Sequence, residues 1–251
     1  MDQPNRKANR RLSDHGMNSQ GVNISNDRVP TGVVGLDDLI EGGLPRGSLI
    51  LLGGCPGSGK TIASAQYLYY GATNLNERGI YVSFSERKET FFKNMKRFGF
   101  DFALLEKKGK FKFLDMMTCD ESAVGSTLNI AFGEVSAMGA KRLVIDSFSA
   151  IAQAFKKKID ARIVIHLLEK IMRQTDCTTL LLVEIPTGSK MIGLGIEEFV
   201  ADGIILFETI EERSGIRKRA IIRKMRGTNH NMNYSNIVIS SKGFSLMPEV
   251  T

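Results

Sequence analysis

The chain has 251 residues, of which 42% are hydrophobic and 24% are charged, and it carries a formal net charge of +7. This composition is typical of a globular protein with a packed core, and it excludes collagen-like, disulfide-framework and wholly disordered chains. The three cysteines, Cys55, Cys119 and Cys177, are scattered and form no C-x-x-C pair, so we expect free thiols rather than a disulfide scaffold or a zinc site.

Residues 1–28 contain few large apolar residues, a basic cluster and no periodicity, which predicts a disordered basic tail. Residues 29–251 are expected to form one domain. The tail lacks the apolar stretch of a secretory signal, and no apolar run in the chain approaches the ~18 residues needed to cross a bilayer. We therefore expect a cytoplasmic protein with no membrane association.

Short apolar runs then alternate with stretches of helical spacing. We predict strands at 48–53, 79–84, 111–116, 142–145 and 178–183, and helices at 60–75 and 159–174. The runs are continuously apolar, as in parallel strands that are covered on both faces. Three further runs, at 203–208, 217–225 and 235–240, are separated only by short polar turns and predict antiparallel strands at one sheet edge. The expected fold class is α/β, with a mainly parallel sheet flanked by helices.

The strongest motif is Gly-Cys-Pro-Gly-Ser-Gly-Lys-Thr at 54–61, here called the phosphate loop. It fits the pattern G-x-x-x-x-G-K-S/T between a predicted strand and a predicted helix. In such loops, glycines let backbone N–H groups point at phosphate oxygens, the lysine reaches the β- and γ-phosphates, and the threonine hydroxyl binds magnesium. A dinucleotide-binding G-x-G-x-x-G pattern fails because Ile62 stands where glycine is needed. The expected ATP-binding residues are Gly54, Pro56, Gly57, Ser58, Gly59, Lys60, Thr61 and Ile62.

Two carboxylates complete the expected site. Asp146 ends a predicted strand, where an aspartate can hold Mg²⁺ through water, although such a residue can also cap a helix. Glu86 follows the strand at 79–84 and is the candidate that orients the attacking water, with a solvated glutamate as the alternative. Lys60 and Glu86 are therefore the expected catalytic residues. The role of Glu184, after the run 180–183, stays open between a γ-phosphate sensor and no role.

Taken in order, these motifs resemble the RecA superfamily, and within it the KaiC-like ATPases of bacteria and archaea. The resemblance rests on T-G-x-x-G-L-D-D-L-x-x-G-G-L-P-x-G at 31–47, the phosphate loop, Y-V-S-F-S-E at 81–86, F-G at 98–99, V-I-D-S at 144–147, E-F-V-A-D-G at 198–203 and K-M-R-G-T-N-H at 224–230. It implies a RecA-type core, ATP with Mg²⁺ as ligands, and a homo-oligomer, with a hexamer as one form, that holds each nucleotide between neighbours.

The resemblance also implies a second group of ATP-binding residues, contributed by a neighbouring subunit. Lys224 and Arg226 would reach the neighbour's phosphates, with Thr228 and His230 close to the nucleotide. On a strand, Lys224 and Arg226 would project to one face, as an arginine finger requires, and a solvated basic strand end is the alternative.

One position departs from the family pattern. Ser85 stands where KaiC-like proteins usually have the first of two adjacent glutamates, so neither the rate of hydrolysis nor self-phosphorylation carries over. The clock protein also has two ATPase domains in tandem, whereas this chain has one, so a clock function does not carry over either.

Three functions remain open. The first is an ATPase that couples its nucleotide state to the conformation of a homo-oligomer. The second is a recombinase paralogue that binds single-stranded DNA, favoured by the basic residues 213–226 but lacking aromatic residues among them. The third is an ATP sensor without hydrolysis, for which Ser85 is the support. His166 is interpreted as a satisfied histidine of a helix rather than a metal ligand.

Overall fold

The computed structural model describes residues 27–116, 124–153, 174–186, 197–213 and 215–249. Residues 1–26 of the predicted tail, Cys119, His166 and nearly all of the predicted helix at 159–174 lie outside these ranges. The elements are β1 (Arg28–Val29), η1 (Asp37–Ile40), β2 (Leu44–Pro45), β3 (Leu49–Gly54), α1 (Lys60–Asn74), β4 (Gly79–Ser83), α2 (Lys88–Lys96), α3 (Phe102–Lys107), β5 (Phe111–Asp115), α4 (Val124–Met138), β6 (Arg142–Asp146), α5 (Phe148–Gln153), β7 (Thr178–Glu184), α7 (Glu197–Val200), β8 (Gly203–Glu212), β9 (Gly215–Met225), β10 (Ser235–Ser240) and β11 (Gly243–Pro248).

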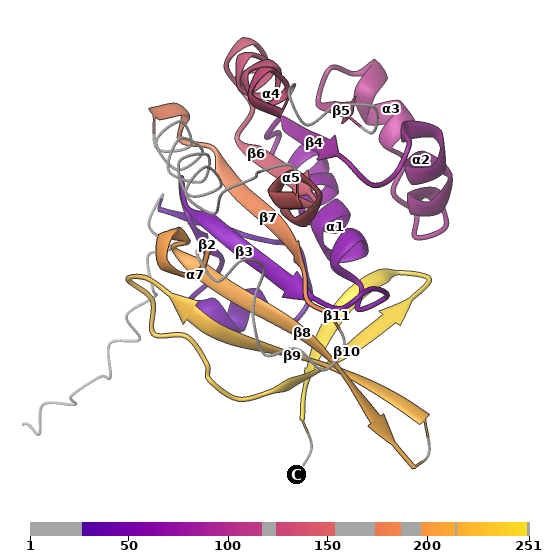
Figure 1. Cartoon of the computed structure of the whole chain (residues 1–251), viewed down its shortest axis with the longest axis vertical. Coiled ribbons are helices and arrows are strands. Elements are labelled where there is room, and N and C mark those ends of the chain that lie inside the picture. Colours follow the sequence, from indigo (N-terminus) through magenta and orange to yellow (C-terminus); the bar gives the residue numbers. More distant parts are fainter. Residues whose placement is uncertain (1–26, 117–123, 154–173, 187–196, 214, 250–251) are drawn as a thin grey trace, which may run out of the picture.

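A nine-stranded sheet runs through the molecule in the order β11-β10-β9-β8-β3-β7-β6-β4-β5 (Figure 1). From β8 to β5 every neighbouring pair is parallel. The pairs β8–β9, β9–β10 and β10–β11 are antiparallel. The expected fold class, a mainly parallel RecA-type sheet with antiparallel strands near the C-terminus, is confirmed.

Strand β8 corrects one detail of the prediction. The run at 203–208 was expected to be antiparallel like those that follow it, but β8 pairs in parallel with β3 and only its other edge is antiparallel, to β9. A parallel pairing needs a crossover connection, for which the chain between β7 and β8 is long enough. The connection from β8 to β9 permits only a hairpin. The antiparallel part of the sheet therefore begins one strand later than expected.

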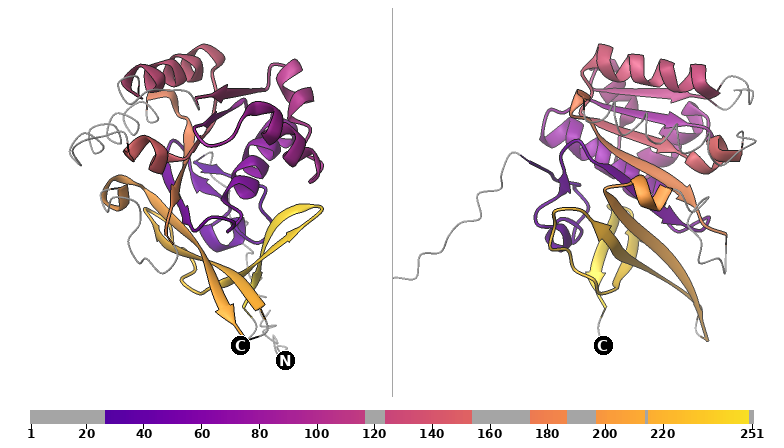
Figure 2. Two further views of the ribbon diagram at one scale, coloured as in Figure 1. Left: turned by 45° about the vertical axis from the view of Figure 1, so that its right-hand side comes forward. Right: turned by 60° about the vertical axis from the view of Figure 1, so that its left-hand side comes forward.

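Both faces of the parallel part of the sheet are covered by helices (Figures 1 and 2). Alternate strand residues such as Ile50 and Leu52 pack with α1, α2 and α3 on one face, and the intervening residues such as Leu51 pack with α4 and α5 on the other. This two-sided burial explains why the parallel strands are continuously apolar in sequence. It also leaves the carboxyl ends of these strands together at one edge, where ligands bind in open α/β sheets.

Several short elements had not been predicted. Helix α2 buries Phe91 and Met95, one helical turn apart, and Asp101 caps α3 by accepting a 3.0 Å hydrogen bond from the Leu104 amide. Arg28, the last residue of the predicted tail, lies in β1 and pairs with Pro45. Cys55 and Cys177 are free thiols, as expected. No helix in the described ranges is long and apolar enough to span a bilayer.

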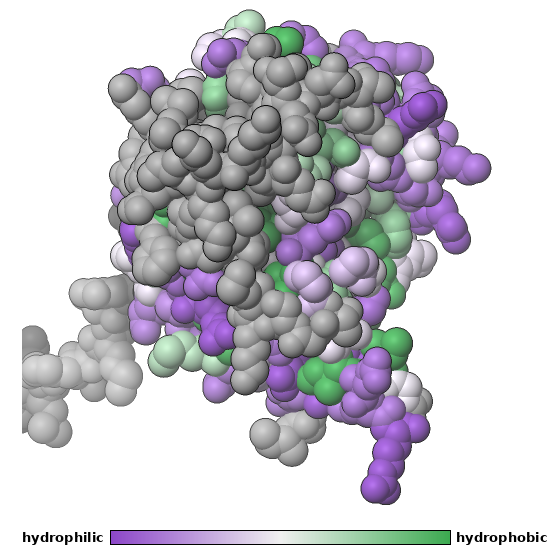
Figure 3. Space-filling view, in the orientation of Figure 1, coloured by the Kyte–Doolittle hydropathy of each residue, from purple (hydrophilic) through white to green (hydrophobic). Residues whose placement is uncertain are grey.

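The β8–β9 hairpin projects beyond the rest of the sheet, and its end is predominantly hydrophilic (Figures 1 and 3). Ion pairs link its two strands, with Arg219 bonded to Glu208 at 2.9 Å and Arg217 to Glu212 at 2.7 Å. Arg217 also pairs with Glu249, and the Arg219 guanidinium stacks on the ring of Tyr234. These pairs hold the basic residues of β9 against carboxylates of the same chain.

Candidate functional site

The phosphate loop lies at the carboxyl end of β3, in the middle of the sheet, and leads directly into α1. Gly59 precedes the helix with a φ of 102°, and a Cβ there would lie 2.9 Å from Ile239 Cδ1, so this position requires glycine. The Ser58 hydroxyl is buried and has no hydrogen-bond partner among the described residues. A buried polar atom of this kind, aimed into a loop at a helix N-terminus, fits an anionic ligand.

Lys60 lies across the loop. Its Nζ donates hydrogen bonds to the carbonyl oxygens of Gly54 at 2.7 Å and Cys55 at 3.1 Å. Burial lowers the pKa of Lys60, an effect that the charges of Glu184 and Asp146 oppose. The ammonium group is thus buried against the loop backbone, where the charges of two carboxylates act on it.

Asp146, at the end of β6, faces the phosphate loop. One of its oxygens, Oδ2, accepts hydrogen bonds from Thr61 Oγ1 at 3.3 Å and from the Tyr81 hydroxyl at 2.6 Å. Burial raises the pKa of Asp146, and both hydrogen bonds oppose that rise. Carboxylate and hydroxyl oxygens are the donors that Mg²⁺ prefers, so the donor set of Thr61 and Asp146 fits this ion.

Tyr81 is a site residue that the sequence did not single out. It is fully buried on β4, beside β6, and its ring packs on Phe91 and Phe113. A tyrosine within an apolar run is ordinarily interpreted as a core residue. The one signal in the sequence is that a buried tyrosine hydroxyl needs a hydrogen-bond partner.

Glu86 lies just beyond β4 and is fixed by local hydrogen bonds. The Ser83 hydroxyl accepts from the Glu86 amide at 3.0 Å and donates to its carbonyl at 2.7 Å, and Asn94 Nδ2 donates to Glu86 Oε1 at 2.8 Å. The carboxylate lines a cavity of about 660 Å³ together with Thr61 and Phe98. Burial raises the pKa of Glu86, the Asn94 hydrogen bond opposes that rise, and Asp146 adds to it. Ser85 is exposed.

Glu184 ends β7, directly beside Gly54 in the parallel register. The Glu184 amide donates a 2.8 Å hydrogen bond to Ser149 Oγ, and Glu184 is exposed to solvent. Its charge acts on both Lys60 and Asp146. The position is suitable for contact with a bound phosphate, but no hydrogen bond between its carboxylate and the phosphate loop is present among the described contacts.

The expected neighbour-directed residues lie at the opposite end of the sheet. The backbone amide of Arg226 donates to the carbonyl of Asp202, which is paired with Leu49 at the start of β3. From Leu49 to Gly54, at ~3.3 Å per strand residue, the separation along β3 is roughly 16 Å. Lys224 and Arg226 therefore lie away from the phosphate loop of their own subunit.

The details of this second group differ in part from the expectation. Arg226 lies one residue beyond the end of β9 rather than on the strand, and a register shift occurs near Lys224. Thr228 Oγ1 accepts a 2.7 Å hydrogen bond from Arg28, and His230 Nδ1 lies 3.3 Å from the Thr228 carbonyl oxygen. The four residues lie in one stretch, residues 224–230, which begins on the last residues of β9 and continues into the segment after it.

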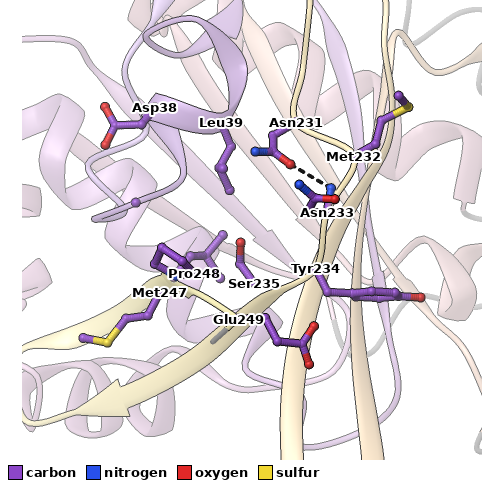
Figure 4. Close-up of a pocket in the computed structure, with 12 residues that line it drawn as sticks. Asp38, Leu39, Asn231, Met232, Asn233, Tyr234, Ser235, Met247, Pro248 and Glu249 are labelled. Atoms are coloured by element: carbon purple, nitrogen blue, oxygen red, sulfur yellow. Dashed lines mark hydrogen bonds between the residues drawn. The ribbon is translucent and has the colours of Figure 1, made fainter. Parts of the chain in front are cut away.

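A second cavity, of about 580 Å³, lies next to this segment and not at the phosphate loop (Figure 4). Leu39, Met232, Tyr234 and Met247 line it, with Asn231 and Asn233 joined by a 2.7 Å hydrogen bond at its rim. Met232 and Met247 are largely exposed.

Comparison with known proteins agrees with this architecture. A family model described as "ATPase: KaiC" matches residues 29–251. The chain is 31% identical to a UPF0273 protein of Methanocaldococcus jannaschii, over 88% of this chain and 97% of that protein. It is also 31% identical to the circadian clock oscillator protein KaiC of Synechococcus elongatus, over 88% of this chain but only 44% of that protein. A crystal structure of a KaiC-like protein from Pyrococcus horikoshii superimposes with a TM-score of 0.80 and 38% identity, covering 88% of this chain and 99% of that one.

The family-model match covers the whole nine-stranded sheet, the phosphate loop and the segment after β9. The chain therefore belongs to the KaiC family of RecA-type, nucleotide-binding ATPases.

Proposed function

We propose that this chain hydrolyses ATP with Mg²⁺ and that it does so as a homo-oligomer, with each nucleotide between two subunits. The observation that carries the proposal is the convergence of Lys60, Thr61, Asp146 and Glu86 at one edge of the parallel sheet, where Thr61 Oγ1 lies 3.3 Å from Asp146 Oδ2. These residues come from three separate parts of the chain: the phosphate loop, the segment after β4 and the end of β6. Phosphoryl transfer depends mainly on positioning and charge stabilisation, which such a convergence supplies.

Each residue has a distinct role in this proposal. The phosphate loop, residues 54–61 together with Ile62, binds the phosphates of ATP, and Lys60 neutralises the β- and γ-phosphates. Thr61 and Asp146 would hold Mg²⁺, Asp146 through water, and the bound ion would supply positive charge next to the phosphate oxygens. Glu86 accepts a proton from the attacking water, and Asn94 fixes the direction of its carboxylate.

The segment after β9 supports the oligomeric part of the proposal. Because Lys224 and Arg226 lie about one strand length from their own phosphate loop, they can act on phosphates only when a second subunit presents its loop to them. Thr228 and His230 would then lie beside the same nucleotide. A hexameric ring is the arrangement we propose.

The pairing of basic residues on β9 weighs against the proposal that the chain binds single-stranded DNA. Arg217 and Arg219 are bonded to Glu212 and Glu208, and Lys218 Nζ donates a 2.6 Å hydrogen bond to the Gly57 carbonyl. Cations held in this way contribute less to binding of a phosphate backbone, since each ion pair must first be broken.

The test is ATP turnover by the full chain with Mg²⁺, with and without single-stranded DNA, compared between wild type and Lys60→Ala. We expect DNA-independent turnover that Lys60→Ala abolishes together with ATP binding. Lys107→Ala, on the exposed surface of α3, is the matched control and should behave as wild type. Strong stimulation by DNA would favour the recombinase alternative, and tight binding without turnover would favour the ATP sensor. ATP binding by Lys60→Ala at wild-type strength would overturn the assignment of the phosphate loop.

A further inference from the structure

Asp202 connects two parts of the chain that the proposed function uses separately. It lies in the turn between α7 and β8 and is buried, with 8% of its surface exposed. Its amide donates to the Leu49 carbonyl at 2.8 Å, and its Oδ2 accepts from the Leu49 amide at 3.1 Å. Leu49 is the first residue of β3, the strand that ends in the phosphate loop.

The same residue holds Arg226. Asp202 Oδ1 accepts from Arg226 NH1 at 3.3 Å, and the Asp202 carbonyl accepts from the Arg226 amide at 2.8 Å. The Arg226 side chain is half exposed, whereas that of Asp202 is 11% exposed. A fixed, buried carboxylate thus contacts one side of a guanidinium group that still reaches solvent.

Lys224 is held by α7 and by the turn that follows it. Its Nζ donates to the Ala201 carbonyl at 2.6 Å and to the Glu198 carbonyl at 3.1 Å. Residues 198–202 therefore provide hydrogen-bond acceptors for both cations. Lys224 is held by backbone carbonyls, whereas Arg226 is also held by the Asp202 side chain. The ion pair between Asp202 and Arg226 can therefore be removed by substitution without altering the backbone.

We propose that Asp202 is a positioning residue that presents Arg226 to the nucleotide of a neighbouring subunit and links it to the start of β3 in its own subunit. The inference rests on the proposed function, because it assumes that Arg226 acts across a subunit interface. A half-exposed ion pair contributes little to stability, but a misplacement of about 1 Å in a catalytic group can lower the rate roughly 100-fold. The main effect of the ion pair is therefore to orient the Arg226 side chain.

The test compares Asp202→Asn, Arg226→Ala and the double variant in the full chain. Asp202→Asn removes the charge that holds Arg226 and keeps a side chain of the same size. We expect turnover to fall by about 10-fold to 100-fold, with ATP binding and the oligomeric state unchanged. Glu134→Gln is the matched control, because Glu134 also forms an ion pair, with Lys112 of β5, the strand at the opposite edge of the sheet from β11. It should leave turnover unchanged.

The double variant separates positioning from a purely structural role. If Asp202 acts through Arg226, the turnover of the double variant equals that of Arg226→Ala alone, because the residue to be positioned is gone. If Asp202 only stabilises the turn, the two losses multiply, and that result would overturn the proposal. Should Asp202→Asn unfold at the assay temperature, Asp202→Ser, whose hydroxyl can still accept from the Leu49 amide, replaces it with the same expected results.

Failure of this inference is distinguishable from failure of the proposed function. Wild-type turnover in Arg226→Ala would show that Arg226 is not used at all, and it would overturn both the positioning role and the part of the proposed function in which Arg226 acts on a neighbour's nucleotide. A large loss in Arg226→Ala with wild-type turnover in Asp202→Asn would overturn only the positioning role.

Discussion

The Tyr81 hydroxyl donates a 2.6 Å hydrogen bond to Asp146 Oδ2, the same oxygen that lies 3.3 Å from Thr61 Oγ1. Tyr81 is fully buried among aromatic rings, so the direction of its hydroxyl is fixed by packing. A residue of the core on β4 thereby orients the carboxylate at the end of β6 that we assign to Mg²⁺. Partners of this kind, one step removed from the metal, commonly influence metal affinity by 10-fold to 100-fold.

Tyr81→Phe should therefore raise the Mg²⁺ concentration needed for half-maximal turnover by about 10-fold, with the maximal rate less affected. The substitution keeps the ring packing but removes the hydrogen bond that holds down the pKa of Asp146. The measurement is turnover against Mg²⁺ concentration, with Tyr69→Phe on α1 as the control. An unchanged Mg²⁺ requirement would show that Asp146 binds the ion without help from Tyr81, or does not bind it.

Glu86→Gln should lower turnover by about two to four orders of magnitude while ATP binding survives, because the amide has the size of the carboxylate but no basicity. Binding of a labelled, slowly hydrolysed ATP analogue checks that the site is intact. Glu89→Gln, nearby on the exposed side of α2, is the control and should be as active as wild type. Turnover by Glu86→Gln close to that of the control would assign the general base elsewhere.

The pH dependence of turnover should report the environment of Glu86. A general base works when deprotonated, so activity is lost as the pH falls through its pKa, which burial has raised above the ordinary value for glutamate. Asn94→Ala removes a hydrogen bond that lowers this pKa, so the acid limb of the kcat/KM profile should move to higher pH. A shift to lower pH, or none, would contradict the assignment of Glu86.

Mixing two inactive variants tests whether Arg226 acts in a neighbouring subunit. Neither a pure Glu86→Gln assembly nor a pure Arg226→Ala assembly has an interface with both groups intact. A mixed assembly has some, because an intact Glu86 in one subunit can meet an intact Arg226 from the next. We expect co-refolded mixtures to hydrolyse ATP faster than the average of the two. Activity equal to that average, in a sample that mass measurement shows to be mixed, would mean that Arg226 does not act in trans.

Gly71→Ala in α1 should destabilise the fold by about 2–4 kcal/mol, although alanine is ordinarily the better helix former by ~1 kcal/mol. A Cβ at this position would lie 2.3 Å from Arg142 Nε. Arg142 is fully buried, pairs with Glu77 at 2.7 Å and cannot move aside without breaking that pair. Gly133→Ala in α4, where a Cβ would meet nothing within 4 Å, is the control and should be neutral or stabilising. Urea unfolding measures both, and equal effects would contradict the packing argument.

The parallel strands and α1 were predictable because two-sided burial leaves a continuous apolar run, and a phosphate loop marks the start of its helix. Strand pairing was harder to predict from the sequence. Nothing within residues 203–208 indicates that β8 pairs in parallel with β3, because this pairing depends on a crossover connection outside the strand. Four site residues could be predicted because a sequence motif or a position at a strand end marks them: Lys60, Thr61, Asp146 and Glu86. Three others could not be predicted: Tyr81, Asn94 and Asp202. Each of these contacts another side chain that is distant in sequence, and only the folded structure shows that contact.

Strand β9 also sets a limit on how such a chain can change in length. Near one end, Lys218 contacts Gly57 of the phosphate loop, and near the other, Lys224 contacts the turn after α7. Inserting or deleting one residue between them would shift one contact relative to the other by ~3.3 Å and turn the intervening side chains to the opposite face of the sheet. Substitutions between Lys218 and Lys224 preserve the number of residues between the two contacts. The projecting tip of the hairpin lies outside this interval. We therefore expect homologous chains to vary freely in the length of the tip, while the interval from Lys218 to Lys224 keeps a constant number of residues.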